Sequence, residues 1–224
     1  MFKFKSIAID GPAGAGKSTV AKHLANKLNY LYVDTGALYR AIGLYMIRNN
    51  ISYTDEMATS ENLKNINLEL KHIDNVQHVF LNGDDVTSKI RSPEVSLAAS
   101  SVSAFKLVRN FLIDLQRNIA KNNNVIMDGR DIATVVLPNA DIKIFLTASA
   151  RIRAIRRYKD LTRINVNKTF DEVYRDMVTR DSNDSSRDIA PLKQAEDALL
   201  IDSSDMGFDE TVDYIYNIIK ERLV

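Results

Sequence analysis

The sequence predicts an α/β protein with a five-stranded parallel sheet, helices on both faces of the sheet and a small antiparallel insertion. Three observations carry this prediction. Five short apolar segments, typical of buried strands, alternate with segments whose apolar residues recur at helical spacing. A glycine-rich loop links the first of these strands to a helix. Between residues 67 and 86, apolar and polar residues alternate as they do in an antiparallel meander.

The composition narrows the class of protein. The chain has 224 residues, which fits one α/β core with appendages, and its 30 basic residues nearly balance 29 acidic ones. A net charge of +1 and the absence of tryptophan argue against nucleic acid or an anionic membrane as a partner. Because there is no cysteine, disulfides, thiolate metal sites and cysteine nucleophiles are excluded. No apolar run approaches the ~20 residues needed to span a bilayer. We therefore expect a cytoplasmic protein, and we expect it to be a monomer.

The first strand, the glycine-rich loop and a helix lie within Ile7–Leu28. Ser6–Ile9 is short and apolar enough to be a buried strand, and Gly11–Ser18 fits the phosphate-binding pattern GxxxxGK[ST]. In that pattern, backbone N–H groups and a helix N-terminus surround phosphate oxygens. Lys17 would reach the terminal phosphates, and Ser18 would offer its hydroxyl to Mg²⁺. A flexible glycine turn before an ordinary lysine is the alternative, which the strand-loop-helix context disfavours.

A second strand at Tyr30–Val33 is followed by Asp34-Thr35-Gly36 and an amphipathic helix. We predict Thr35 as the N-cap of this helix. The same helix N-terminus also suits a bound phosphate, with Arg40 one turn further on to assist. The residues alone leave these two roles of Thr35 open.

The antiparallel insertion is predicted over Asn67–Val86, with turns at Asp74-Asn75 and Asn82-Gly83. Ser92 then caps a helix whose first residue is Pro93. Another helix, with apolar residues at positions 108, 112, 115 and 119, ends at residues 122–124. We expect one domain whose core covers residues 1–60, 90–150 and 171–224, with the insertion at about 63–90.

The third strand, Val125–Met127, ends in Asp128-Gly129-Arg130-Asp131. Ligands of α/β proteins collect beyond the carboxyl ends of parallel strands, so Asp128 is predicted to hold a metal-bound water. An ordinary polar turn is the alternative reading of these four residues, and it stays open here.

A basic helix follows the fourth strand, Ile142–Leu146. Arg153, Arg156 and Arg157 share one face of this helix by their spacing. Such a face is usually only solvated. Its position after a core strand and before the polar stretch 159–168 instead suggests a mobile lid over a triphosphate, at about residues 153–170.

The last part of the chain contains a helix at Phe170–Thr179, the charged stretch Arg180–Arg187, the fifth strand Ala198–Ile201 and a helix at Thr211–Leu223. With this order, the phosphate loop follows the central strand, and eight arginines gather around it: Arg40, Arg109, Arg130, Arg153, Arg156, Arg157, Arg180 and Arg187. Transfer between two phosphate-bearing substrates brings many negative charges together. The arginines therefore favour phosphoryl transfer over a nucleotide-operated switch.

The chain resembles bacterial-type cytidylate kinases, of the nucleoside monophosphate kinase group, over essentially its full length. Five motifs appear in the family order: IDGPAGAGKST, VDTGALYRA, VTSKIRSPEVS, VIMDGRDIATVV and RDSNDSSRDIAPL. The phosphate loop alone identifies only a superfamily, whereas DGRD and the RDxxDxxRxxxPL ending separate this group from adenylate-kinase-like relatives. The resemblance implies the P-loop kinase fold, ATP as phosphoryl donor, CMP or dCMP as acceptor, and Mg²⁺ as cofactor.

The resemblance also implies roles for individual residues. The ATP-binding set is Gly11, Pro12, Ala13, Gly14, Ala15, Gly16, Lys17, Ser18, Thr19 and Arg156. The CMP-binding set is Thr35, Arg40, Ser100, Arg109, Gly129, Arg130, Asp131, Arg180, Asp184 and Arg187. The catalytic set is Lys17, Arg130, Arg153, Arg157, Arg180 and Arg187. Ser18 and, through a water, Asp128 would contact the metal.

The chemistry of this reaction explains what the sequence lacks. The CMP phosphate is already an anion, so no histidine or carboxylate has to act as general base. An ionised Asp131 could accept from the N4 amino group of cytosine, whereas uracil presents an oxygen there. UMP is therefore expected to be a poor substrate, because this contact discriminates between the two bases by roughly 1–3 kcal/mol.

Three other readings share the phosphate loop. A switch-type NTPase would need a water-positioning residue, which we do not find, and a nucleic-acid-binding ATPase would need a basic stripe with stacking aromatics. A kinase for another small acceptor, such as UMP or shikimate, is the nearest alternative among enzymes.

Overall fold

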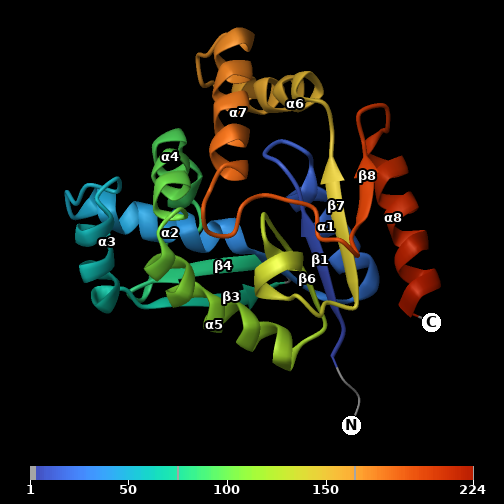
Figure 1. The fold of residues 1–224 in the computed structure, drawn as a ribbon, viewed down its shortest axis with the longest axis horizontal. Coiled ribbons are helices and arrows are strands. Elements are labelled where there is room, and N and C mark those ends of the chain that lie inside the picture. Colours follow the sequence, from blue (N-terminus) through green and yellow to red (C-terminus); the bar gives the residue numbers. More distant parts are fainter. Residues whose placement is uncertain (1–3, 75, 164, 224) are drawn as a thin grey trace.

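The computed structural model describes residues 4–74, 76–163 and 165–223. Its central element is a parallel sheet in the order β2-β6-β1-β7-β8 (Figure 1). These strands span, in that order, Leu31–Asp34, Val125–Gly129, Ser6–Asp10, Ile142–Thr147 and Leu199–Asp202. All neighbouring pairs are parallel. The five-stranded sheet predicted from the sequence is confirmed, with the strand that precedes the glycine-rich loop at its centre.

Most of the remaining elements are helical. The α-helices are α1 Lys17–Leu28, α2 Thr35–Arg48, α3 Glu56–Asn62, α4 Pro93–Val102, α5 Lys106–Asn122, α6 Ala150–Arg163, α7 Phe170–Ser185 and α8 Phe208–Leu223. The short turns are 3-10 helices η1 Leu63–Asn65 and η2 Lys89–Arg91 and the π-helical η3 Ile132–Val136. Helix α3 and the three short turns were not predicted from the sequence. Within the described ranges, no helix combines the length and apolarity needed to cross a membrane.

Helices pack on both faces of the sheet, as predicted. On β1, Ile7 and Ile9 face a core cluster that they share with α1 and α8. Ala8, between them, belongs to a second cluster with Met127 and Ile132 on the other face. This separation follows from the two-residue period of a strand. Because both faces are covered, the strand reads as a continuous apolar run.

The insertion forms a separate antiparallel sheet of β3 Leu68–Ile73, β4 Val76–Leu81 and β5 Asp84–Asp85. Its buried leucines and valines join α2 and α4 in a third core cluster. The predicted turn at Asn82-Gly83 is confirmed, since both residues have positive φ angles of 50° and 88°. In the other predicted turn, Asp74 has φ 51°, while Asn75 lies outside the described residues.

The register of the core sheet brings acidic residues to its carboxyl edge. Asp34 at the end of β2 is paired with Asp128 on β6, and Asp10 at the end of β1 is paired with Gly129. The glycine-rich loop leaves β1 at this edge, and α2 begins there. The edge therefore combines negative side chains with two helix N-termini.

Two local predictions are wrong. Asp34, and not Thr35, is the N-cap of α2, because its side chain accepts from the backbone N–H of Ala37 at 3.0 Å. A carboxylate caps a helix as well as a hydroxyl does, so adjacent candidates could not be separated by type. Helix α7 does not end at Thr179 but continues to Ser185. Its charged residues therefore lie along a helix.

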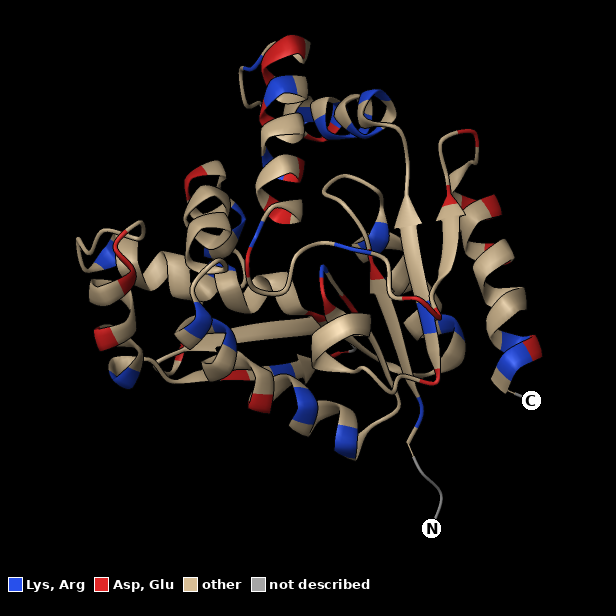
Figure 2. Ribbon diagram, viewed as in Figure 1, with Lys and Arg blue, Asp and Glu red and all other residues tan. Residues whose placement is uncertain are grey.

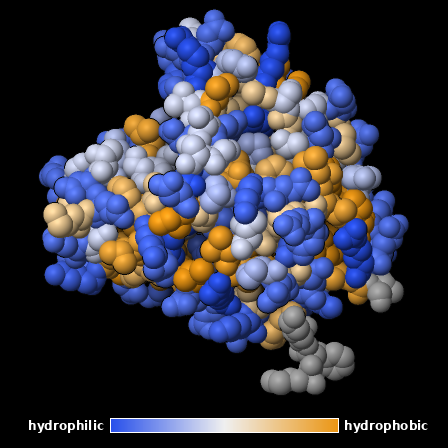
Figure 3. Space-filling model, viewed as in Figure 1, coloured by the Kyte–Doolittle hydropathy of each residue, from blue (hydrophilic) through white to orange (hydrophobic). Residues whose placement is uncertain are grey.

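Helices α6 and α7 form a hairpin that stands over the carboxyl edge of the sheet (Figure 1). Helix α6 carries a dense group of basic residues (Figure 2), and the hairpin is a mainly hydrophilic lobe in Figure 3. The first part of the predicted lid is helical up to Arg163, and Ile164 lies outside the described residues. Thr169 and Glu172 form a capping box that starts α7.

Candidate active site

A cavity of about 1230 Å³ opens at the carboxyl edge of the sheet, between the glycine-rich loop, the start of α2, α4 and the α6–α7 hairpin. The predicted site residues that line it are Ala13, Gly14, Ala15, Gly16, Lys17, Ser18, Thr19, Thr35, Arg40, Ser100, Arg109, Asp128, Gly129, Arg130, Asp131, Arg156, Arg157, Arg180, Asp184 and Arg187. Three predicted residues, Gly11, Pro12 and Arg153, are not part of its lining. The structure thus gathers most of the predicted set from distant parts of the chain.

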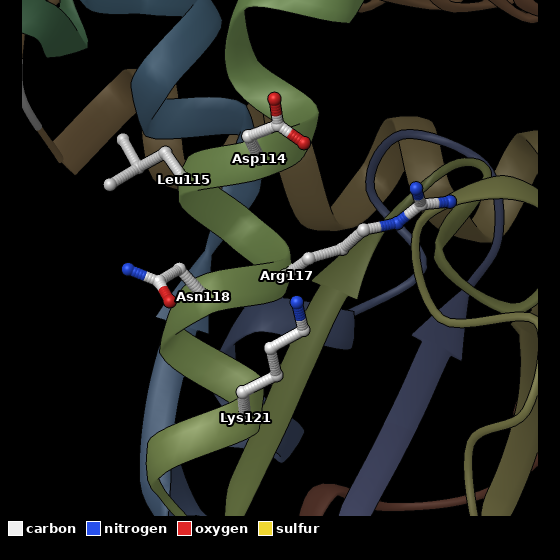
Figure 4. Close-up of a pocket in the computed structure, with 5 residues that line it drawn as sticks. All are labelled: Asp114, Leu115, Arg117, Asn118 and Lys121. Atoms are coloured by element: carbon white, nitrogen blue, oxygen red, sulfur yellow. The ribbon is translucent and has the colours of Figure 1, made fainter.

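A second hollow, of about 470 Å³, lies on the surface of α5 (Figure 4). Its lining residues, Asp114, Leu115, Arg117, Asn118 and Lys121, all come from this one helix. Arg117 donates to the backbone carbonyls of residues 135 and 136 at 2.9 and 3.0 Å, which ties the helix to η3. A single helix face without a backbone N–H cradle does not make a phosphate site, so the larger cavity is the candidate.

The glycine-rich loop has the conformation that a phosphate cradle requires. Gly11, Gly14 and Gly16 have φ angles of 146°, 74° and 91°, which side chains with a Cβ rarely adopt. Lys17 donates from Nζ to the carbonyl of Pro12 at 2.7 Å. Burial and the nearby charge of Arg130 hold the pKa of Lys17 well below its usual range. An anion bound in the loop would offset both effects.

Asp128 is held from two sides by hydroxyl groups. Ser18 donates to Oδ2 at 2.7 Å, and Tyr32 donates to Oδ1 at 2.9 Å. Burial and the charge of Asp34 raise the pKa of Asp128 to about 6. The carboxylate and the Ser18 hydroxyl are hard oxygen ligands, next to the phosphate loop, of the kind that Mg²⁺ prefers.

The start of α2 carries a buried carboxylate with two arginines. Oδ2 of Asp34 accepts from Arg40 at 2.7 Å and lies 3.6 Å from the guanidinium of Arg91. Nε of Arg40 is buried without a hydrogen-bond partner in the described part of the chain. Thr35 donates to the backbone carbonyl of Asp128 at 2.8 Å, which joins α2 to β6.

Gly129, the last residue of β6, lies where this strand packs closely against Thr35 of α2 and Ile132 of η3. A Cβ at this position would lie 2.6 Å from Cδ1 of Ile132 and 2.8 Å from the hydroxyl of Thr35. A larger residue here would therefore force the side chain of Ile132 or Thr35 to move.

A second buried carboxylate, Asp184 on α7, binds two of the predicted arginines. Arg130 donates from Nε to Oδ2 at 2.9 Å, and Arg187 contacts Oδ1. Burial opposes its charge, but Arg130 and Arg187 outweigh that effect and lower the pKa of Asp184. Burial and the charge of Arg130 lower the pKa of Arg180 to about 10. Nε of Arg180 has no hydrogen-bond partner among the described residues. This cluster carries more positive than negative charge, as an anion site does.

At another end of the cavity, Asp131 is paired with Arg109, and both side chains are buried. Arg109 also donates to the carbonyl of Ser103 at 2.8 Å and lies 5.5 Å from the ring centre of Tyr39. Ser100 lines the cavity on α4. A carboxylate beside a fixed guanidinium offers both an acceptor and donors to the edge of a planar base.

The arginines of α6 take different positions. Arg156 donates to the carbonyl of Ser203 at 2.7 Å and lines the cavity together with Arg157. Arg153 is buried instead: it donates to the carbonyls of Ala148 and Ala13 at 2.7 and 3.0 Å. It also pairs with Asp181 of α7 at 2.7 Å. Arg153 therefore joins α6 and α7 to the glycine-rich loop.

Sequence reasoning missed several residues that build this site. Asp34 was treated as part of a turn, and neither Tyr32 nor Asp181 was given a role in the site. Asp10 was also missed: it is buried and accepts from the backbone N–H groups of Ile132 and Ala133 at 2.9 and 2.7 Å. The available signal was an aspartate at the end of each of the first two apolar strands along the chain, Asp10 and Asp34.

Known proteins resemble this chain along nearly its whole length. The family model described as cytidylate kinase matches residues 7–221. A cytidylate kinase of Leuconostoc mesenteroides is 50% identical over 217 residues, which cover 97% of this chain and 97% of that protein. A cytidylate kinase of Caldicellulosiruptor bescii is 47% identical over 222 residues, which cover 97% of this chain and 98% of that protein.

A solved structure shares the fold at low sequence similarity. An uncharacterised protein of Eubacterium ventriosum superposes with a TM-score of 0.55 at 14% identity, and the match covers 98% of this chain and 100% of that one.

Proposed function

The chain belongs to the cytidylate kinase family, and we infer that it transfers the γ-phosphoryl group of ATP to CMP or dCMP, giving ADP and CDP or dCDP. One observation supports this most directly. A single cavity has the glycine-rich loop at one end and the Asp131–Arg109 pair at another, with Arg130, Arg180 and Arg187 also in its lining. Two phosphate-bearing nucleotides could meet in such a cavity.

In this proposal ATP occupies the end formed by the glycine-rich loop. The backbone of residues 11–19 surrounds its phosphates, and Lys17 leaves the carbonyl of Pro12 to contact them. Arg156 and Arg157 approach from α6 above this loop. Helix α1 begins at Lys17, so its N-terminus adds a favourable dipole.

Ser18 and Asp128 would hold Mg²⁺, Ser18 directly and Asp128 through a water. Their oxygen chemistry fits the ion. Among the residues that the structure describes, no group of three or more His, Cys, Asp or Glu side chains could hold a metal by itself. The ATP phosphates would therefore complete the coordination. When bound, the ion would neutralise part of the phosphate charge.

CMP would occupy the other part of the cavity. Thr35 and Arg40 would face its phosphate, with Arg130 and Arg187 reaching towards it. Ser100 joins Arg109 and Asp131 at the cytosine, and Arg180 and Asp184 contact the sugar. The Nε groups of Arg40 and Arg180, which are buried and have no partner within the described ranges, support an anion at this position, because buried donors without a partner are costly.

The transfer itself is an in-line displacement. An oxygen of the CMP phosphate forms a bond to the γ-phosphorus, and the bond from that phosphorus to the β,γ-bridging oxygen breaks. No proton has to be removed, since the attacking oxygen is already an anion. Lys17 and the arginines stabilise charge as it moves, and Arg153 acts by holding the lid helices on the glycine-rich loop.

The α6–α7 hairpin is proposed as the lid. Closing it would exclude water, which otherwise competes as acceptor and hydrolyses ATP. We also propose that the protein acts as a monomer in the cytoplasm.

Measurement of ADP release with CMP, dCMP, UMP, AMP and shikimate tests the proposal. CMP or dCMP should give the highest kcat/KM, UMP a value lower by roughly 10- to 100-fold, and AMP and shikimate background rates. Acceptor-independent hydrolysis at the same rate as with CMP, or a preference for UMP or shikimate, would refute it.

A further inference from the structure

Strand β2 has an open edge in the core sheet. It lies at the end of the strand order, so the outer backbone groups of Tyr32 and Asp34 pair with no strand in the described ranges. Residues two apart on a strand point to the same side, and these two therefore present their N–H and C=O groups together. Unpaired backbone groups at a sheet edge need partners.

Two side chains of the inserted sheet supply those partners. Gln77 accepts from the N–H of Asp34 at 2.8 Å and donates to its carbonyl at 3.3 Å. The imidazole of His72 lies 2.8 Å from the carbonyl of Tyr32. His72 and Gln77 face each other directly across β3 and β4. This cross-strand pair thus takes the place of a sixth strand on the β2 edge.

Asp34, whose backbone is held by Gln77, also binds Arg40 through its side chain. Asp34 uses one carboxylate oxygen to cap α2 at the N–H of Ala37 and the other to bind Arg40 at 2.7 Å. Arg40 lines the cavity, and its Nε has no hydrogen-bond partner among the residues that the structure describes. A continuous chain of hydrogen bonds therefore runs from the inserted sheet through Asp34 to a guanidinium at the acceptor end of the cavity.

We propose that Gln77 is a positioning residue for acceptor binding: by clamping the backbone of Asp34 it sets the direction of Arg40. The inference rests on the proposed function, in that Arg40 faces the CMP phosphate. Gln77 is not among the residues that line the cavity, so it would act on the acceptor only through Asp34 and Arg40. Removing the Gln77 amide should therefore weaken acceptor binding and leave ATP binding at the glycine-rich loop unchanged.

The test uses Gln77→Met, which keeps the length of the side chain and removes both hydrogen bonds. Gln194→Met is the matched control: Gln194 also donates to a backbone carbonyl, that of Ala198 at 2.8 Å, but Ala198 does not line the cavity, whereas Asp34 does. KM for CMP should rise roughly tenfold in Gln77→Met, while KM for ATP stays within about twofold of the wild type. The control should change neither constant.

A second measurement separates positioning from a loss of stability. In an Arg40→Lys background, Gln77→Met should add less than about twofold to KM for CMP, because the group that it positions is already altered. Equal effects in both backgrounds would overturn the proposal, as would a lower melting temperature with an unchanged KM for CMP. If Gln77→Met does not fold, Gln77→Asn replaces it, since its shorter amide cannot span the same contacts.

These outcomes are distinguishable from failure of the proposed function. If the wild-type protein shows no CMP-dependent ADP release, the proposed function fails. If the wild type is active and Gln77→Met leaves KM for CMP unchanged, only the positioning role fails.

Discussion

The hydroxyl of Tyr32 donates a hydrogen bond of 2.9 Å to Oδ1 of Asp128, opposite the bond from Ser18 to Oδ2. Burial and the charge of Asp128 raise the pKa of Tyr32, so the hydroxyl stays protonated and remains a donor. The carboxylate proposed to hold a metal-bound water is thereby fixed in orientation by β2 on one side and α1 on the other.

Tyr32→Phe removes only this hydroxyl. The free energy of unfolding should fall by roughly 1–3 kcal/mol, because a buried carboxylate loses a donor. The Mg²⁺ concentration for half-maximal activity should rise, and calorimetric titration should show weaker Mg²⁺-dependent ATP binding. Tyr214→Phe on the exposed face of α8 serves as control and should leave the stability and the Mg²⁺ dependence unchanged. An unaltered Mg²⁺ dependence in Tyr32→Phe would show that the bond is only structural.

Arg130→Ala should abolish most CMP-dependent turnover while ATP binding is kept. Arg130 lines the cavity and contacts Asp184, and loss of an arginine that stabilises a transferring phosphoryl group costs on the order of 10³-fold in kcat. Steady-state ADP release and ATP titration measure the two effects. Arg163→Ala, in which the replaced side chain is mostly exposed, provides the comparison. Full activity of the Arg130 variant would remove this residue from the mechanism.

Asp131→Asn should weaken the preference for CMP over UMP. The change removes the charge that is proposed to accept from the N4 amino group of cytosine, a contact worth roughly 1–3 kcal/mol. The kcat/KM for CMP should fall by about 10- to 100-fold, and the value for UMP should fall less. Asp114→Asn on the surface of α5 controls for the loss of one negative charge. A constant CMP to UMP ratio would exclude Asp131 from base recognition.

Gly11→Ala should disrupt the start of the phosphate loop. A Cβ at Gly11 would lie 1.9 Å from the carbonyl oxygen of Leu146 on β7, and the φ of 146° adds strain. The backbone of two core elements must shift, so melting temperature and ATP affinity should both fall. Gly207→Ala is the matched control, because no atom lies within 4 Å of its added Cβ. An unchanged melting temperature in Gly11→Ala would contradict this geometry.

Asp10 should make stability depend on pH. Burial raises its pKa from 3.8 to about 6, so between these values the folded state binds a proton that the unfolded state has released. The contribution of Asp10 to stability is therefore full below pH 3.8 and is lost as the pH rises through about 6. The unfolding free energy of the wild type minus that of Asp10→Asn should therefore decrease by on the order of 2–3 kcal/mol between pH 4 and pH 7.

Urea denaturation at several pH values measures this difference. Asp209→Asn, at the exposed start of α8, is the control. A difference between wild type and Asp10→Asn that stays constant across the range would show that Asp10 does not titrate in this window.

The elements that could be predicted from the sequence are those set by local patterns. Ser6–Ile9 and Val125–Met127 are apolar runs bounded by glycine or aspartate, and each became a core strand within two residues of the predicted bounds. Pro93 after Ser92 marked the start of α4 because proline fits only the first turn of a helix. The glycine-rich loop was identifiable because its backbone conformation demands residues without a Cβ.

Helix caps and helix ends were harder to predict. Asp34 and Thr35 are adjacent residues that can each cap a helix, and the choice depended on β2 ending at Asp34. The end of α7 depended on Asp184, which is a poor interior residue by propensity but is held there by Arg130 and Arg187. Tertiary ion pairs outweighed the local preference.

The sequence by itself determined the order of strands and helices along the chain, the phosphate loop and the set of arginines. These features follow from local periodicity, glycine placement and motif spacing. Only the tertiary structure decided which partners the charged groups take. Arg153 of α6 is buried and contacts α7 and the glycine-rich loop, Gln77 is hydrogen-bonded to the backbone of Asp34, and Tyr32 is hydrogen-bonded to Asp128. These contacts join residues far apart in sequence, and their energies depend on burial and distance, which no local pattern encodes.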